Sequence, residues 1–360
     1  MMPVNLNVSA MLERAELFFP HKEVVSRTKE GMHRFTYKEI GARTRRLSSA
    51  LQRLGVGVGD RVGTLAYNHH RHLEAYFGIP GLGAVIHTIN PRLAPEHIIY
   101  TINHAGDKVL LVDEELLPLV EKIQSRLPSV QAYVVMSDSS SVPPSSLQPL
   151  YAYEGLLMEG DPRFPFYKDL DEYAPAGLCY TFSAAGAPKG VLYSHRALVL
   201  HSFAVGLADT FGLSEADVCL PVVPMFHVNA WGLPYAATWF GAKQVLPGAN
   251  FTPEVLAKLI EREKVTVTAG VPTIWMGLYP LLEKGDYDTS SLRAVVCGGS
   301  AAPPALIQRY EENLGIPFYH AYGLTETTPL VTVARLKSYQ ETLSGEEKLA
   351  LKSKQGLLVP

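Results

Sequence analysis

Residues 95–113 read PEHIIYTINHAGDKVLLVD, and their pattern indicates the fold class. Ile98, Ile99 and Ile102 recur at helical spacing, which predicts a helix over Pro95–His104. Residues 108–113, KVLLVD, form a short apolar run that is typical of a strand covered on both faces of its sheet. Helical and strand-like patterns alternate in the same way along most of the chain. The sequence therefore favours βα units and a parallel sheet.

The composition narrows the class of protein. Of the 360 residues, 47% are hydrophobic and 19% are charged, a balance that excludes intrinsic disorder for most of the chain. The formal net charge is −3, from 32 basic and 35 acidic residues. This charge gives no electrostatic reason to expect a nucleic acid or an anionic membrane as partner.

Cysteine usage and hydropathy indicate the compartment. Cys179, Cys219 and Cys297 are widely spaced and form no C-x-x-C motif, so we expect a reducing, cytoplasmic setting. The most apolar long stretch, residues 218–242, is interrupted by prolines and polar side chains. We expect this stretch to lie in the protein interior and not to span a membrane. The amino terminus lacks a basic region followed by an apolar run, so we expect no signal peptide.

Residues 180–191, YTFSAAGAPKGV, are the first candidate for a binding segment. A strand is expected to end in a flexible turn that holds Gly186, Lys189 and Gly190. Glycines let the backbone approach an anion closely, and the lysine adds a positive charge. The Walker A order of residues is absent, and an ordinary strand–turn–strand hairpin explains the segment equally well.

Two further segments are expected to follow strands. In residues 322–327, YGLTET, Glu326 stands between two hydroxyls and suits Mg²⁺ carried by a phosphate substrate, while Tyr322 could stack on a purine. A capped turn is the alternative. Residues 297–303, CGGSAAP, make room for a flat ligand at the carboxyl edge of a sheet or simply form a tight βα turn.

Residues 221–234, PVVPMFHVNAWGLP, place His227 and Trp231 in an apolar segment with proline kinks. Taken alone, a histidine or tryptophan in such a segment is more often a packed core residue than a catalyst or a gate.

The order and spacing of these segments carry more information than any one of them. The series YT-x4-G-x-PKGV-x-x-SH, P-x-FH, GGS-x-AP and YG-x-TE resembles the adenylate-forming, or AMP-binding, superfamily. Residues 68–93, 194–202 and 224–237 are most similar to its fatty-acyl-CoA synthetase branch. The resemblance runs from about Leu6 to Pro360.

The resemblance implies roles for individual residues. Lys189, His227 and Glu326 are expected to serve the reaction, with Thr181 and Glu326 as ligands of Mg²⁺. The other residues expected to bind the nucleotide are Ser183, Gly186, Gly190, Val228, Gly299, Ser300, Ala301, His320, Ala321, Tyr322, Gly323 and Thr325. Trp231 is expected to gate an acyl tunnel, with Val271 and Pro272 in its wall.

The implied reaction is attack of a fatty-acid carboxylate on the α-phosphorus of ATP, which expels pyrophosphate. Both reactants are anions, so catalysis would depend on charge neutralisation and alignment. The thiolate of coenzyme A would then displace AMP from the acyl-adenylate. The expected partners are therefore a fatty acid, ATP and CoA, with a homodimer as a further expectation.

Two departures from the family pattern matter. The family usually has Ser/Thr-Gly-Thr-Thr where this chain has Phe182-Ser183-Ala184-Ala185. Two lost hydrogen bonds to phosphate would cost on the order of 10²–10⁴ in affinity or rate if nothing compensates. The sequence also stops where the family's β-barrel subdomain is expected to begin, so no residue is assigned the roles of the carboxy-terminal domain.

The expected architecture is α/β, with two stacked lobes of largely parallel β-sheets flanked by helices. We expect residues 1–360 to form an incomplete AMP-binding domain, with lobes at about 62–210 and at about 1–61 plus 211–345. Residues 137–149 are rich in serine and proline and are expected to be a loop. Two alternatives stay open, a non-catalytic nucleotide- or acyl-binding fragment and an adenylating enzyme for another carboxylic acid.

Overall fold

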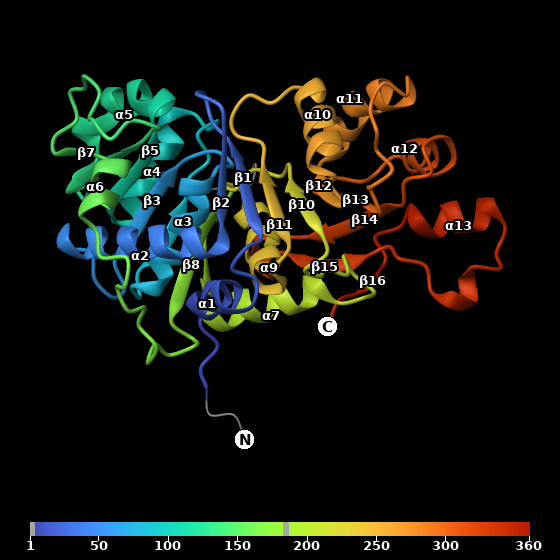
Figure 1. The fold of residues 1–360 in the computed structure, drawn as a ribbon, viewed down its shortest axis with the longest axis horizontal. Helices are drawn as coiled ribbons and strands as arrows, with labels where there is room; N and C mark the ends of the chain where they lie inside the picture. Colours follow the sequence, from blue (N-terminus) through green and yellow to red (C-terminus); the bar gives the residue numbers. More distant parts are fainter. Residues whose placement is uncertain (1–3, 183–186) are drawn as a thin grey trace. The chain divides into compact units, whose positions relative to one another are not determined.

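The computed structural model describes residues 4–182 and 187–360. The described residues form two compact units, each with one β-sheet and its own helices (Figure 1). The first unit draws on Met1–His21, Phe35–Val199 and Pro224–Asn229. The second unit draws on Lys22–Arg34, Leu200–Val223 and Ala230–Pro360.

The sheet of the first unit has seven strands among the described residues, in the order β7-β6-β5-β3-β4-β8-β9. Its strands are β3 (Arg61–Leu65), β4 (Val85–Thr88), β5 (Asp107–Asp113), β6 (Ala132–Met136), β7 (Leu150–Ala152), β8 (Pro175–Thr181) and β9 (Lys189–Ser194). Neighbours are parallel as far as β8, and β9 pairs with β8 in antiparallel fashion. An apolar cluster that includes Leu110, Val112, Ile98 and Ile102 fills one side of this sheet.

Helices accompany each strand of this sheet. They are α1 (Val8–Phe18), α2 (Tyr37–Arg53), α3 (His70–Gly81), α4 (Pro95–Ala105), α5 (Leu117–Ile123) between the short helices η1 (Glu114–Leu116) and η2 (Gln124–Arg126), α6 (Tyr153–Glu159) and the start of α7 (His195–Gly206). The Thr36 hydroxyl accepts the Glu39 N–H and the Glu39 carboxylate accepts the Thr36 N–H, so a capping box starts α2. The left-handed residue Gly106 ends α4.

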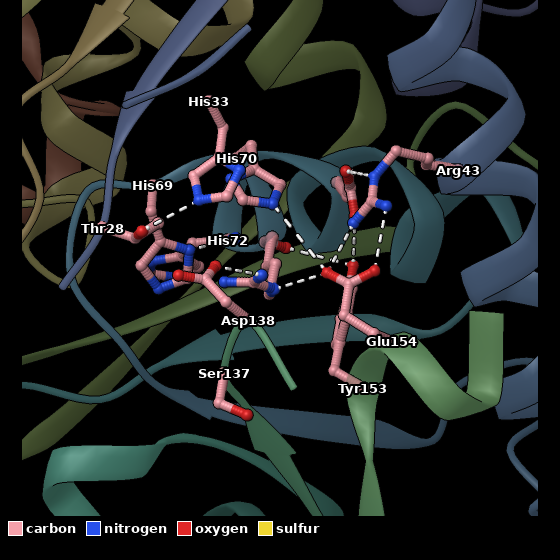
Figure 2. Close-up of polar contacts among 12 residues, drawn as sticks. Thr28, His33, Arg43, His69, His70, His72, Ser137, Asp138, Tyr153 and Glu154 are labelled. Carbon is pink, nitrogen blue, oxygen red and sulfur yellow. Dashed lines mark hydrogen bonds and ion pairs between the residues drawn. The ribbon is translucent and has the colours of Figure 1, made fainter. Parts of the chain in front are cut away.

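A buried ionic network joins α2, α3 and α6. Arg43 donates to both Glu74 and Glu154, and Arg71 donates to Glu154 at 2.7 Å and to Asp138 at 2.6 Å. In Figure 2 the dashed lines from Arg43 meet at the Glu154 carboxylate. Burial alone would raise the pKa of Glu154, but Arg43 and Arg71 outweigh it and hold that pKa below its usual value. The network therefore fixes three helices of one unit by charge as well as by apolar packing.

The sheet of the second unit has nine strands among the described residues, in the order β16-β15-β14-β13-β12-β10-β11-β1-β2. Its strands are β1 (Glu23–Arg27), β2 (Met32–Thr36), β10 (Val218–Pro221), β11 (Lys243–Leu246), β12 (Val267–Gly270), β13 (Ala294–Cys297), β14 (Phe318–Gly323), β15 (Leu330–Val333) and β16 (Leu357–Leu358). Neighbouring strands in the series β1, β11, β10, β12, β13 and β14 are parallel, and β15 and β16 continue the sheet beyond β14 in antiparallel fashion.

The helices of the second unit pack their apolar residues on this sheet, as for Leu256, Ile260 and Trp275. They are the rest of α7, the short turn α8 (Val228–Trp231) that begins in the first unit, α9 (Leu233–Phe240), α10 (Pro253–Glu263), α11 (Pro272–Glu283), α12 (Pro304–Gln308), η3 (Arg309–Asn313), η4 (Thr325–Thr327), η5 (Ser338–Gln340) and α13 (Gly345–Lys352). None of the helices in the described residues combines the length and apolarity needed to cross a membrane.

The expected fold class is confirmed: both sheets are mostly parallel and are flanked by helices, with β9 antiparallel at the edge of one sheet and β15 and β16 antiparallel at the edge of the other. One grouping differs from the sequence-based division, which put residues 1–61 with the second lobe. Helix α2 packs in the first unit, where the Ser48 hydroxyl donates to the Gly78 carbonyl of α3 at 2.8 Å. The lobe boundaries as a whole stay a prediction.

Candidate active site

The hairpin of β8 and β9 presents the basic segment. Thr181 lies opposite Lys189 and Cys179 opposite Val191 in the antiparallel register. Side chains alternate along a strand, so Cys179, Thr181 and Lys189 share one face of the hairpin. Lys189 is exposed and Thr181 is half-buried. A hydroxyl and an ammonium group therefore stand side by side at the open end of the sheet.

The opposite face of the hairpin is closed by Tyr180. A Cβ atom at Gly190 would lie 3.1 Å from Leu178 Cδ1 and 3.3 Å from Tyr180 Cζ, so glycine suits this position for lack of space. A 2.7 Å hydrogen bond joins the Tyr180 hydroxyl and His104 Nδ1. Burial raises the pKa of Tyr180, which keeps its phenol neutral.

The predicted loop residues Ser183 and Gly186 lie outside the described residues. The strand–turn–strand hairpin, one of the two interpretations of the segment, is observed in the backbone on either side of them. A phosphate-binding role for the turn stays a prediction.

His227 lies in a segment that belongs to the first unit. Met225 anchors this segment, because its N–H donates to Asn68 Oδ1 at 2.8 Å and its carbonyl accepts the Tyr76 hydroxyl. His227 is exposed, yet surrounding protein atoms desolvate its ring and lower its pKa. Val228 is buried. The imidazole is therefore held neutral at physiological pH.

The chain turns left-handed directly after His227. Val228, Asn229, Ala230 and Trp231 have φ of 45°, 52°, 49° and 56°, and Gly232 has φ of 73°. Such residues cost roughly 1–2 kcal/mol each in this region when they are not glycine. The apolar pattern could not reveal this turn, because nothing in residue type predicts consecutive left-handed residues.

In the second unit, predicted residues gather at the carboxyl edge of the sheet. Gly270, Cys297 and His320 are aligned across β12, β13 and β14. Val271 and Pro272 follow β12, with Pro272 as the first residue of α11. Gly299, Ser300 and Ala301 follow β13 and are exposed. The three strand ends therefore bring these segments together at one edge, where ligands bind in open α/β sheets.

Trp231 covers the glycine turn after β13. A Cβ atom at Gly298 would lie 3.2 Å from Trp231 Cη2, and one at Gly299 would lie 3.5 Å from Trp231 Cζ2 and 3.2 Å from Val271 Cγ1. The glycines leave room for the indole ring and the valine. The acyl-site residues Trp231 and Val271 thus touch the turn expected to line the nucleotide pocket.

The expected turn at Tyr322 is corrected by the structure. We expected the strand to end before Tyr322-Gly323, but β14 continues through Gly323, because Ala321 and Tyr322 pair with Val333 and Thr332 of β15. His320 and Ala321 are buried, whereas Tyr322 and Gly323 are half-buried. A strand fixes the Tyr322 backbone more firmly than a turn would.

The acidic segment forms the short helix η4. Thr325 is buried and Glu326 is exposed. The Leu324 N–H donates to the Thr327 hydroxyl at 3.0 Å, so the capped turn is present. The described residues contain no cluster of three or more histidine, cysteine or acidic side chains that could hold a metal. One carboxylate and hydroxyls still suit Mg²⁺ that arrives with phosphate oxygens and water.

The two units thus hold separate parts of the predicted site. The first contains Thr181, Lys189, Gly190, His227 and Val228. The second contains the residues expected around adenine and acyl chain, together with Glu326. Sequence reasoning missed Asn68, Tyr76 and Asn229, whose contacts span distant segments. The polar residues Asn68 and Asn229 beside apolar stretches were the available signal.

The family described as AMP-binding enzyme matches residues 12–360. A long-chain-fatty-acid–CoA ligase of Thermus thermophilus is 55% identical over 100% of this chain and 65% of its own length. A medium-chain-fatty-acid–CoA ligase of Ectopseudomonas oleovorans is 44% identical over 99% of this chain and 65% of its own length.

A solved structure is similar as well. The anthranilate CoA ligase AuaEII in complex with anthranoyl-AMP matches with a TM-score of 0.86 at 25% identity, over 99% of this chain and 65% of that one. The chain spans about 65% of the length of the curated relatives described above. With the family match across nearly the whole chain, these similarities show that the chain belongs to the AMP-binding enzyme family.

Proposed function

We propose that the protein activates a medium- or long-chain fatty acid as its acyl-adenylate at the expense of ATP, for transfer to CoA. The observation that carries the proposal is the Thr181–Lys189 pair on the face of the β8–β9 hairpin. Because the chain belongs to a family of AMP-binding enzymes, we propose that this ammonium group and hydroxyl meet the phosphates of ATP. The two ligase relatives support fatty acids as the substrate class.

The role proposed for each side chain in the reaction follows from its chemistry. The Lys189 ammonium offsets phosphate charge, so that the anionic carboxylate can approach the α-phosphorus. Neutral His227 can donate or accept a hydrogen bond near the reacting oxygens without adding charge. Trp231 and Val271 supply an apolar lining for the acyl chain. The carboxylate oxygen forms a bond to the α-phosphorus as the bond to pyrophosphate breaks.

Magnesium belongs to the proposal as well: the Glu326 carboxylate and the Thr181 hydroxyl are each an oxygen group that would suit the ion as a ligand, and the ion would neutralise phosphate charge. A cytoplasmic location is proposed because the three cysteines are free and buried, which suits a reducing compartment. A homodimer is proposed from the sequence expectation alone, and the molar mass from light scattering would decide it.

Pyrophosphate release from ATP·Mg²⁺ in the presence of fatty acids of different lengths tests the proposal. We expect release that depends on the fatty acid and falls at least about tenfold in Glu326→Gln, because a metal ligand is lost. Glu30→Gln changes an exposed glutamate elsewhere and should leave the rate unchanged.

Other outcomes would favour the alternatives. ATP binding without any release would favour a non-catalytic nucleotide-binding protein. Release with an aromatic or amino acid but with no fatty acid would favour an adenylating enzyme for another carboxylic acid. Equal rates in Glu326→Gln and in the unaltered protein would contradict the role given to Glu326.

A further inference from the structure

The segment that carries His227 is docked on the same sheet face that carries Thr181 and Lys189. All residues of this docking site belong to the first unit. Cys179 lies on β8 two residues before Thr181, so their side chains share a face. Gly177 and Tyr193 are paired further along the same face. This face therefore extends from the phosphate-binding end to a buried thiol.

Asn229 covers this buried part of the sheet. The Cys179 thiol contacts Asn229 Oδ1 at 3.7 Å and Thr88 Oγ1 at 3.2 Å. A Cβ atom at Gly177 would lie 3.8 Å from Asn229 Nδ2, so the carboxamide lies over both Gly177 and Cys179. Asn229 and Cys179 are 3% exposed each, which places the contact in the protein interior.

Main-chain groups complete the contact. The main chain of Val228 and Asn229 and the Tyr193 side chain also interact with the Cys179 thiol and partly offset the effect of burial on its pKa. Burial raises the pKa of this thiol to about 11, so it stays protonated and can donate to Asn229 Oδ1. The sulfur thus joins β8 directly to the backbone of the segment that follows His227.

The left-handed backbone makes this contact necessary. Val228 and Asn229 both have positive φ, and a β-branched residue such as valine is seldom found there. Strained backbone persists only where its surroundings hold it in place. The Met225 anchor holds the segment before His227, and the Cys179–Asn229 contact holds it after His227. Without the second contact the chain could relax to an ordinary turn and move the imidazole.

We propose that Asn229 and Cys179 are positioning residues, which lock the left-handed turn onto β8 and so set His227 in register with Thr181 and Lys189. The inference rests on the proposed adenylation reaction for its functional consequence. Neither residue needs to touch a substrate. The contact holds His227, which is proposed to act near the substrate carboxylate, in a fixed position relative to Thr181 and Lys189, which are proposed to bind phosphate.

The test combines kinetics with hydrogen–deuterium exchange in Asn229→Ala, Cys179→Ala and the double variant. We expect kcat for pyrophosphate release to fall about 10- to 100-fold, because misplacement by about 1 Å has effects of this size. KM for ATP should change less than about threefold, because Thr181 and Lys189 remain. Amide exchange should rise over residues 224–232. The double variant should be no worse than the more severe single one, because both remove one contact.

Two controls separate positioning from stability. Cys219→Ala removes another fully buried thiol, on β10, and should lower the melting temperature without changing kcat or exchange over 224–232. Cys179→Ser keeps a hydrogen-bonding group and should restore part of the kcat that Cys179→Ala loses.

The outcomes distinguish this inference from the proposed function. If the unaltered protein releases no pyrophosphate, the proposed function fails, and the exchange data still decide whether the contact locks the turn. Unchanged exchange over 224–232 in Asn229→Ala and Cys179→Ala would overturn the inference. Losses of kcat no larger than in Cys219→Ala would overturn it as well.

Discussion

Gly298 has no room for a side chain. A Cβ atom there would lie 2.7 Å from the Ala321 carbonyl oxygen and 3.2 Å from Trp231 Cη2. The carbonyl belongs to β14, which is paired on both edges and cannot retreat, so the Gly298 backbone would have to shift and would press on the indole beside it. A single methyl group at this position therefore tests whether Trp231 and the nucleotide edge form one site.

We predict that Gly298→Ala destabilises the second unit by roughly 1–3 kcal/mol, as overpacking usually does, and weakens ATP binding. Thermal unfolding and nucleotide titration measure the two effects. Gly277→Ala is the matched control. Gly277 lies on helix α11, and a Cβ atom there meets only Pro253 Cγ, at 3.7 Å. The substitution should be neutral or stabilising. Equal ATP affinity in Gly298→Ala and the unaltered protein would contradict the proposal that Trp231 of the acyl site contacts the nucleotide-binding turn.

At the scale of elements, the ionic network of α2, α3 and α6 joins helices that belong to different parts of the sequence. Glu154 accepts hydrogen bonds from Arg43 and Arg71, and its side chain is only 19% exposed. Removing the Glu154 charge would take one of the two ionic partners from both Arg43 and Arg71, which keep only Glu74 and Asp138. Breaking a buried pair from one side is far more costly than losing a surface pair.

We predict that Glu154→Gln lowers the free energy of unfolding by about 3 kcal/mol. Glu96→Gln breaks the exposed pair with Arg126 and should change the free energy of unfolding far less than Glu154→Gln does. Urea titrations followed by fluorescence and far-ultraviolet circular dichroism give both values. Similar losses of unfolding free energy in the two variants would show that the buried network stabilises the fold no more than a surface ion pair does.

Elements whose pattern is local were predictable from the sequence. The helix expected over Pro95–His104 is α4, and the strand expected over residues 108–113 is β5, because each has its own apolar periodicity. The extension of β14 to Gly323 depends on pairing with β15, a partner that a local pattern does not specify. The turn at Val228 depends on Cys179 and Asn68, residues far away in the sequence. The candidate residues were therefore predictable by motif, whereas the contacts that hold them were not.

At the scale of the whole molecule, buried neutral histidines make stability depend on pH. Burial lowers the pKa of His195 and of His201 to about 4. An unfolded chain binds these protons near pH 6.5, so between about pH 6.5 and pH 4 it binds more protons than the folded chain. The folded state is therefore fully favoured by these groups above pH 6.5 and loses this stability as the pH falls.

We predict that the melting temperature falls steadily from pH 6.5 to pH 4.5 and that His195→Gln flattens this dependence. Each such histidine contributes up to about 1.4 kcal/mol per pH unit in this range. Substitution of the exposed His21 by Gln should leave the slope unchanged. A slope that is the same in His195→Gln and in the unaltered protein would rule out His195 as a source.

The central claim for the molecule is that the hairpin of β8 and β9 binds the phosphates of ATP. Isothermal titration of ATP·Mg²⁺ into the unaltered protein, Lys189→Met and Lys29→Met measures this most directly, because Lys29 is an exposed lysine on another segment. We predict saturable binding that weakens at least about tenfold in Lys189→Met, the effect of losing a charged hydrogen bond to phosphate, and stays unchanged in Lys29→Met. The same affinity in all three proteins, or no saturation in any of them, would contradict the claim.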